Sequence, residues 1–203
     1  MASENISCQS CGDSLTSPLY CFSCNTIQTI SNNLDHFEVM GLPHSFEIDL
    51  EELENLYQRL TLGMHPDFFG VASEEKKTLS EKSSAMLNSA YNSLLTPASR
   101  ATYLLSFFAK GKSLQTNKLP EGFLQEMFSL QESLDEKLDS NDQSALSKIK
   151  DDLQKRYNLT ESNYADLFKK LETSPDSSEI LQQLQTQLNI ERYLRRLLDR
   201  INS

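Results

Sequence analysis

Apolar residues recur every three or four positions through most of the chain after residue 46, and this spacing constrains the fold more than any other feature. The clearest example is the series Leu50, Leu53, Leu56 and Leu60. Such a period places one side chain per turn on the same face of an α-helix. Alternation with a period of two, which is typical of strands, is nearly absent. The sequence therefore predicts an all-α fold.

Capping and helix-breaking residues divide the first half of this pattern into segments. Asp35 and Asp49 each stand as N-caps before a helical run, the first short and the second longer. A third helix opens at Ser73 and ends at Thr96, because the residue before a proline disfavours the α conformation. A fourth, short helix covers residues 99–110. The two long helices are joined by a short loop, which predicts an antiparallel hairpin.

Three further helices follow a polar linker at residues 111–119. The first two cover about residues 121–139 and 142–171, and the last begins at Ser174-Pro175-Asp176, with serine as cap and proline in the first turn. Their short connections predict a three-helix bundle, whose last helix carries Arg192, Arg196 and Arg200 in an outward row.

The first helix of this bundle has a second apolar stripe. Leu124 and Phe128 lie about 100° or more around the helical wheel from the main stripe. Apolar pairs that are exposed and rimmed by polar residues mark interfaces. The alternative is that both side chains pack against the preceding domain or the linker.

All four cysteines lie in the first 33 residues, as the two C-x-x-C pairs Cys8/Cys11 and Cys21/Cys24. Two such pairs can supply four thiolates in the tetrahedral arrangement that suits one structural zinc ion. A segment this small cannot order itself by burial, so the metal would supply most of its folding free energy. Two disulfides, a redox-active pair and an iron–sulfur cluster are the alternatives. Disulfides fit poorly in a chain without an export signal.

Composition and charge disfavour several classes of partner. The chain has 29 acidic and 19 basic residues and a formal charge of −10, which would repel a nucleic-acid backbone. No apolar run approaches the roughly 20 residues needed to span a bilayer. The first residues lack the pattern of a secretory signal or of a transit peptide, so a cytoplasmic location is expected, with a mature mitochondrial form as the alternative.

The order of these segments resembles the J-domain co-chaperones of iron–sulfur cluster biogenesis, the HscB type. The resemblance rests on DHFEVMGLP at 35–43, MHPDFF at 64–69, NSAYNSLLTPASRATYLL at 88–105 and FLQEMFSLQESLDE at 123–136. The four cysteines are similar to the tetracysteine extension of some members, including eukaryotic ones. The resemblance implies the following division of the chain: a metal-binding segment at 1–33, a J-domain at 34–110, a linker at 111–119 and a C-terminal three-helix bundle at 120–203.

The resemblance implies that the chain catalyses no reaction itself. It implies that His65, Pro66 and Asp67 dock on a DnaK-class heat-shock ATPase and trigger its ATP hydrolysis, with Arg59 and Lys76 on the flanking helices. Proline gives the loop tip one shape, and aspartate can then offer its carboxylate to an arginine of the partner.

The helix before this loop departs from the family. Members usually present several basic residues there to an acidic chaperone surface, whereas this chain offers only Arg59. Leu56 and Leu62 stand where basic residues are common, and packing into the core is the alternative role of Leu62. Electrostatic steering toward the chaperone is therefore expected to be weak.

The resemblance also implies that the bundle binds an IscU-type scaffold protein, on which clusters are built. Matched by motif, this surface consists of Leu124, Gln125, Phe128, Ser129 and Glu132, with Tyr193 on the last helix. The chain is expected to be a monomer or a weak dimer.

Three rival functions stand beside this one. The first is a general J-domain protein that acts in protein folding without a dedicated scaffold client. The second is a metal hydrolase that uses His65 and Asp67. This function is disfavoured, because His36 and His44 complete no second acid–histidine cluster. A zinc-dependent nucleic-acid binder is opposed by the charge.

Overall fold

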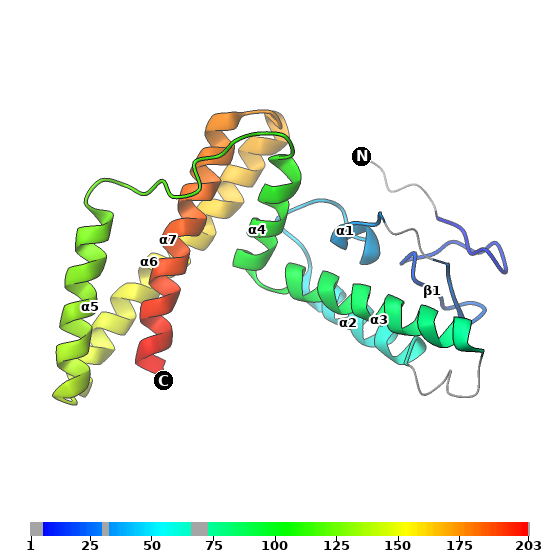
Figure 1. Cartoon of the computed structure of the whole chain (residues 1–203), viewed down its shortest axis with the longest axis horizontal. Coiled ribbons are helices and arrows are strands. Elements are labelled where there is room, and N and C mark those ends of the chain that lie inside the picture. The colour runs from blue at the N-terminus through cyan, green and yellow to red at the C-terminus, as the bar shows by residue number, and fades with distance from the viewer. Residues whose placement is uncertain (1–5, 30–32, 66–72, 203) are drawn as a thin grey trace. The chain divides into compact units, whose positions relative to one another are not determined.

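The computed structural model describes residues 6–29, 33–65 and 73–202 (Figure 1). These ranges contain seven helices and one two-stranded sheet, which confirms the all-α prediction. The chain divides into two compact units, Met1–Arg100 and Ala101–Ser203. The four domain ranges expected from the sequence stay a prediction. Within the described ranges, no helix is long and apolar enough to cross a membrane.

The first unit begins with the small sheet. Strands β1 (Tyr20–Cys21) and β2 (Thr26–Ile27) pair antiparallel, with Tyr20 opposite Ile27 and Cys21 opposite Thr26. Leu19, which precedes β1, is fully buried. The cysteine-containing segment is therefore folded onto the unit by apolar burial as well as by its own turns.

Three helices follow in this unit: α1 (His36–Val39), α2 (Leu50–Gly63) and α3 (Glu74–Leu95). Asp35 and Asp49 cap α1 and α2 as predicted, each accepting two backbone N–H groups. Helices α2 and α3 lie side by side and run in opposite directions (Figure 1), which confirms the predicted hairpin.

Helix α4 (Pro97–Phe108) begins with a proline in its first turn, where a missing N–H costs nothing. Its Arg100 is buried, and Nε donates to the Phe46 carbonyl at 2.6 Å while Nη1 donates to the Leu94 carbonyl at 2.6 Å. The guanidinium also lies 5.1 Å from the centre of the Phe46 ring. This one side chain ties the start of α4 to the loop before α2 and to the end of α3.

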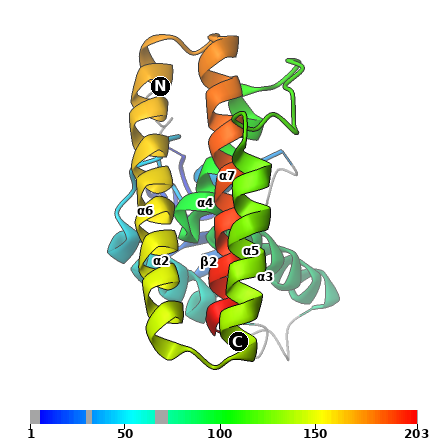
Figure 2. The same cartoon turned by 90° about the vertical axis from the view of Figure 1, so that its left-hand side faces the viewer.

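The second unit contains α5 (Phe123–Asp139), α6 (Gln143–Thr173) and α7 (Ser178–Asn202). The three helices run side by side (Figure 2), which confirms the predicted bundle. Their shared core consists of buried residues from all three helices: Met127, Leu134, Leu146, Leu153, Leu194, Leu197 and Leu198.

The start of the last helix differs from the sequence prediction. Ser174 caps the C-terminus of α6, and its N–H donates to the carbonyls of Lys170 and Leu171 at 3.1 Å each. Its backbone has left the helical conformation (φ −142°, ψ 66°), because the proline that follows disfavours that conformation. Helix α7 starts at Ser178, and the hydroxyl of Ser177 accepts the N–H of Ile180 at 3.3 Å. The predicted start at residues 174–176 is therefore wrong.

The polar segment at residues 111–119 lies along α7. Gln115 exchanges two hydrogen bonds with the Gln182 side chain, at 2.8 and 3.0 Å. The Asn189 side chain donates to the carbonyls of Thr116 at 2.8 Å and Lys118 at 3.1 Å. These bonds attach the expected linker to the bundle.

Candidate functional site

The four cysteine sulfurs gather at one point of the first unit. The Sγ atoms of Cys8, Cys11, Cys21 and Cys24 all lie within 4.8 Å of one another. The Cys8–Cys24 and Cys11–Cys21 pairs are 3.6 and 3.7 Å apart. A tetrahedral zinc ion with bonds of about 2.3 Å needs sulfurs roughly 3.8 Å apart, whereas a disulfide needs about 2 Å. The four side chains can therefore hold one metal ion.

Two tight turns bring these sulfurs together. In the first, the Cys8 N–H donates to the Asp13 carbonyl at 2.7 Å, and the Gly12 N–H donates to the Cys8 carbonyl at 3.0 Å. Gly12 has φ +81°, a left-handed conformation that glycine adopts without strain. The second turn joins β1 to β2 and has Asn25 at φ +54°. Asparagine tolerates this conformation better than most residues do.

The thiols influence one another's ionisation. Against the cost of desolvation, the backbone N–H groups of Cys11 and Ser10 and the neighbouring thiols lower the pKa of Cys8 to about 6. Although the backbone of Asp13 favours its thiolate, desolvation and the other thiols raise the pKa of Cys11 to about 12. A first thiolate thus opposes a second, and a cation at the centre would remove that opposition.

The residues predicted to contact a chaperone fall on two elements. Arg59 is exposed in the last turns of α2, and His65 is exposed just after this helix. Lys76 is exposed in the first turn of α3. Pro66 and Asp67 lie outside the described residues. Leu62, one turn from Arg59, is 67% exposed, so the alternative that it packs into the core is wrong.

The structure brings together three of the residues predicted for scaffold binding. Leu124 and Phe128 on α5 and Tyr193 on α7 line one cavity of about 100 Å³. Leu124 is 43% exposed and Phe128 is 67% exposed, so the second stripe of α5 faces outward as an apolar surface. Gln125, Ser129 and Glu132 are exposed too, but they do not line this cavity.

The same cavity includes residues that the sequence analysis missed as site residues. It is also lined by Met127, Gln131, Arg196 and Leu197. The Arg196 guanidinium lies 5.9 Å from the centre of the Tyr193 ring. The three-residue spacing of these two residues on one helix is the signal that could have found Arg196, since such neighbours share a face.

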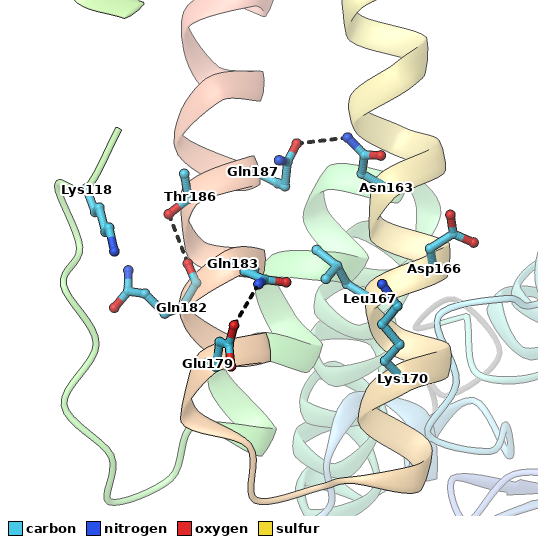
Figure 3. Close-up of a pocket in the computed structure, with 10 residues that line it drawn as sticks. All are labelled: Lys118, Asn163, Asp166, Leu167, Lys170, Glu179, Gln182, Gln183, Thr186 and Gln187. Carbon is cyan, nitrogen blue, oxygen red and sulfur yellow. Dashed lines mark hydrogen bonds between the residues drawn. The ribbon is translucent and has the colours of Figure 1, made fainter. Parts of the chain in front are cut away.

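A second cavity, of about 620 Å³, lies between α6 and α7 (Figure 3). The residues that line it are mostly polar: Lys118, Asn163, Asp166, Leu167, Lys170, Glu179, Gln182, Gln183, Thr186 and Gln187. Several are bonded to one another, as the Asn163 amide is to Gln187 at 3.3 Å and the Gln183 amide to Glu179 at 3.4 Å (Figure 3). None of the described residues predicted for a site lines this cavity.

The sequence is similar to curated co-chaperones. Residues 119–202 match the family model described as the HSCB C-terminal oligomerisation domain. The human protein "Iron-sulfur cluster co-chaperone protein HscB" is 30% identical over 173 residues, which cover 85% of this chain and 72% of the human one. The "Co-chaperone protein HscB homolog" of Aliivibrio salmonicida is 38% identical over 117 residues, or 56% of this chain and 67% of that protein.

Solved structures agree with this similarity. The crystal structure of human co-chaperone protein HscB matches with a TM-score of 0.77 at 26% identity and covers 97% of both chains. Chaperone HscB from Vibrio cholerae matches with a TM-score of 0.68 at 26% identity, over 83% of this chain and 96% of that one. The chain therefore belongs to the HscB family of co-chaperones of iron–sulfur cluster biogenesis.

Proposed function

We propose that this co-chaperone binds an IscU-type scaffold protein and delivers it to a DnaK-class heat-shock ATPase. In this proposal the His65-Pro66-Asp67 loop stimulates ATP hydrolysis by the chaperone and so promotes cluster assembly and transfer. The observation that carries the proposal is the apolar cavity on the bundle, where the exposed Leu124 and Phe128 meet Tyr193.

The composition of this surface suits a protein partner. At typical interfaces a few residues packed in pockets supply most of the binding free energy, with aromatic side chains and arginine prominent among them, and the contacts around them exclude water. Phe128 and Tyr193 are such aromatic residues, with Gln131 and Arg196 beside them. In the proposal Gln125, Ser129 and Glu132, which are exposed on α5, form the polar rim of the interface.

The chaperone contact is proposed at the other unit. Arg59 is exposed on α2, His65 just after it and Lys76 on α3. In the sequence these residues stand on either side of Pro66 and Asp67. We assign the J-domain to residues 34–110, the linker to 111–119 and the scaffold-binding bundle to 120–203. The chain acts as a monomer or a weak dimer in this proposal, in the cytoplasm or as a mature mitochondrial form.

We further propose that one structural zinc ion binds Cys8, Cys11, Cys21 and Cys24. The spacing of the sulfurs supports a single ion, because four irons in a cluster would hold the sulfurs further apart. When bound, zinc supplies the positive charge that stabilises four thiolates at this separation.

The test separates the two surfaces with two variants. The double variant Leu124→Ser, Phe128→Ser should lower scaffold affinity at least about tenfold in calorimetric titration, since two apolar contacts are lost. Leu159→Ser is the matched control, because Leu159 is 63% exposed on α6 and does not line the cavity. His65→Gln should abolish stimulation of the chaperone's ATPase and leave scaffold affinity unchanged.

Two outcomes would contradict the proposal. Scaffold binding that survives the double substitution would favour a general J-domain protein without a dedicated scaffold client. Full stimulation of the ATPase by His65→Gln would remove the J-domain mechanism itself.

A further inference from the structure

Two aromatic side chains that flank a predicted metal ligand contact the last two turns of α2. Tyr20 and Phe22 stand on either side of Cys21. A Cβ atom added to Gly63 would lie 2.8 Å from the Tyr20 ring, so the helix and the ring already touch. The Arg59 guanidinium lies 4.2 Å from the centre of the Phe22 ring. The two rings also meet edge to face, with centroids 5.2 Å apart.

The Tyr20 side chain is hydrogen-bonded to the turn that carries the second cysteine pair. Its hydroxyl donates to the Asn25 side chain at 3.2 Å, and Asn25 directly follows Cys24 in the turn between β1 and β2. Tyr20 is buried. Its position against Gly63 therefore depends on the turn that carries Cys21 and Cys24.

Other contacts seat the cysteine segment on α1. The hydroxyl of Ser17 donates to the Val39 carbonyl at 2.8 Å in a buried hydrogen bond. A Cβ atom at Gly41 would lie 1.9 Å from the Thr16 carbonyl oxygen, so the two backbones are in direct contact. The segment is thus packed into the first unit and is not an appendage held only by its ends.

We infer that the tetracysteine segment positions the chaperone-contacting end of α2. Tyr20 and Phe22 are the positioning residues, and they couple metal occupancy at Cys21 and Cys24 to Gly63 and Arg59. The inference rests on the proposed chaperone contact of Arg59 and of the loop that starts at His65.

Metal occupancy is coupled to the end of α2 because the Phe22 ring restricts Arg59 and the Tyr20 ring restricts the backbone at Gly63. Arg59 is the only basic residue of α2, and a guanidinium stacked on an aromatic ring samples fewer rotamers than one in water. An ordered side chain loses less entropy when a partner binds it. Gly63 stands two residues before His65, so a ring against Gly63 also restrains the end of α2 next to His65. Loss of the metal removes the bonds that close the β1–β2 turn, which contains Phe22 and accepts the Tyr20 hydroxyl at Asn25.

The test uses the full chain and two matched cation–aromatic pairs. Phe22→Leu removes the ring beside Arg59 but keeps an apolar side chain. Phe107→Leu is the control, because the Phe107 ring on α4 lies 4.6 Å from the ammonium of Lys110, which follows that helix. The measurements are the metal content per chain, the hydrogen-exchange rates of residues 59–65 and the Kd for the nucleotide-bound chaperone.

We expect Phe22→Leu to keep its metal, to speed exchange in residues 59–65 and to raise the chaperone Kd about threefold, the size of one exposed cation–π contact. Phe107→Leu should change none of these quantities. Removing the metal from the wild-type chain with a chelator should speed exchange in the same residues and raise the Kd at least as much. The chelator should change the exchange rates and the chaperone Kd of Phe22→Leu less than it changes those of the wild-type chain.

Unchanged hydrogen-exchange rates in residues 59–65 after metal removal would overturn the inference, regardless of the chaperone Kd. A separate result identifies failure of the proposed function, namely a chaperone Kd and ATPase stimulation that His65→Gln leaves unchanged. The exchange rates need no chaperone, so the two failures are distinguishable.

Discussion

Phe123 and Tyr193 meet edge to face, with ring centroids 5.7 Å apart and planes at 81°. This contact joins the first residue of α5 to α7 and so sets where the next turn of α5 lies against α7. Leu124 and Phe128 consequently share a cavity with the same tyrosine.

Tyr193→Ala should therefore weaken scaffold binding about tenfold, because it removes both an anchor and the wall of the cavity. Tyr193→Phe keeps the ring and should bind within about twofold of wild type. Calorimetric titration of the scaffold measures both variants, and circular dichroism checks that the bundle stays folded. An alanine variant that binds like wild type would show that the cavity is not the contact surface.

Gly41→Ala should destabilise the first unit far more than a glycine substitution elsewhere. Gly41 has φ +61°, and an added Cβ atom would meet the Thr16 carbonyl oxygen at 1.9 Å. Gly111 has a similar φ of +75° but no atom within 4 Å of such a Cβ atom, so it isolates the backbone strain. We expect Gly41→Ala to cost at least about 2 kcal/mol more than Gly111→Ala in urea unfolding. Equal losses would mean that the contact with Thr16 adjusts freely.

Arg100→Ala should lower the free energy of unfolding by about 2–4 kcal/mol, since two buried carbonyls lose a charged donor. Arg192→Ala is the control, because Arg192 is exposed on α7 and its loss should cost less than about 0.5 kcal/mol. Denaturant unfolding followed by circular dichroism compares the two. Similar small losses in both would show that the carbonyls of Phe46 and Leu94 find other donors.

Glu191 should make the bundle less stable as pH rises. Its side chain is 1% exposed, and burial raises its pKa above the ordinary 4.5, although Arg195 at 3.6 Å acts in the opposite direction. Between the unfolded and the folded pKa the native state binds more protons than the unfolded state. The contribution of Glu191 is thus fully present below pH 4.5 and is lost as pH rises through the folded pKa.

Glu191→Gln should flatten this dependence, because glutamine carries no charge at any pH. The free energy of unfolding, measured by denaturant from pH 4 to pH 8, tests the slope. Glu172→Gln on the exposed end of α6 should leave the slope as in wild type. A slope that Glu191→Gln does not change would show that the carboxylate is stabilised elsewhere in the bundle.

Metal analysis should find one zinc ion per chain with four sulfur ligands at about 2.3 Å by X-ray absorption. Chelation should expose the first 29 residues to proteolysis and leave the bundle intact, because these residues have little core of their own. Iron with a visible charge-transfer spectrum would instead identify a cluster or a single iron site.

Much of the architecture could be predicted from the sequence, because an α-helix places apolar residues three or four positions apart in the chain. The caps at Asp35 and Asp49 and the apolar stripes of α2 and α7 need only near neighbours in the chain. The start of α7 could not be read in the same way. Serine followed by proline is compatible with either a helix start or a helix end, and the hydrogen bonds of Ser174 back to α6 decide between them.

The two candidate sites also differ in how far the sequence predicts them. The spacing of the cysteines was sufficient to predict a site that can hold a metal ion, because each C-x-x-C turn can direct two sulfurs at one point. The meeting of Tyr193 with Leu124 and Phe128 joins residues about 65 or more positions apart, and no local pattern measures that separation.

From its residues alone, this chain determined most of its helical segments, its two cysteine pairs and its second apolar stripe, since each depends on interactions between near neighbours. Only the tertiary structure decided which side chains from different elements meet, such as Phe22 beside Arg59. The physical reason is that packing selects among many partners of similar polarity by shape, and shape exists only after the helices have assembled.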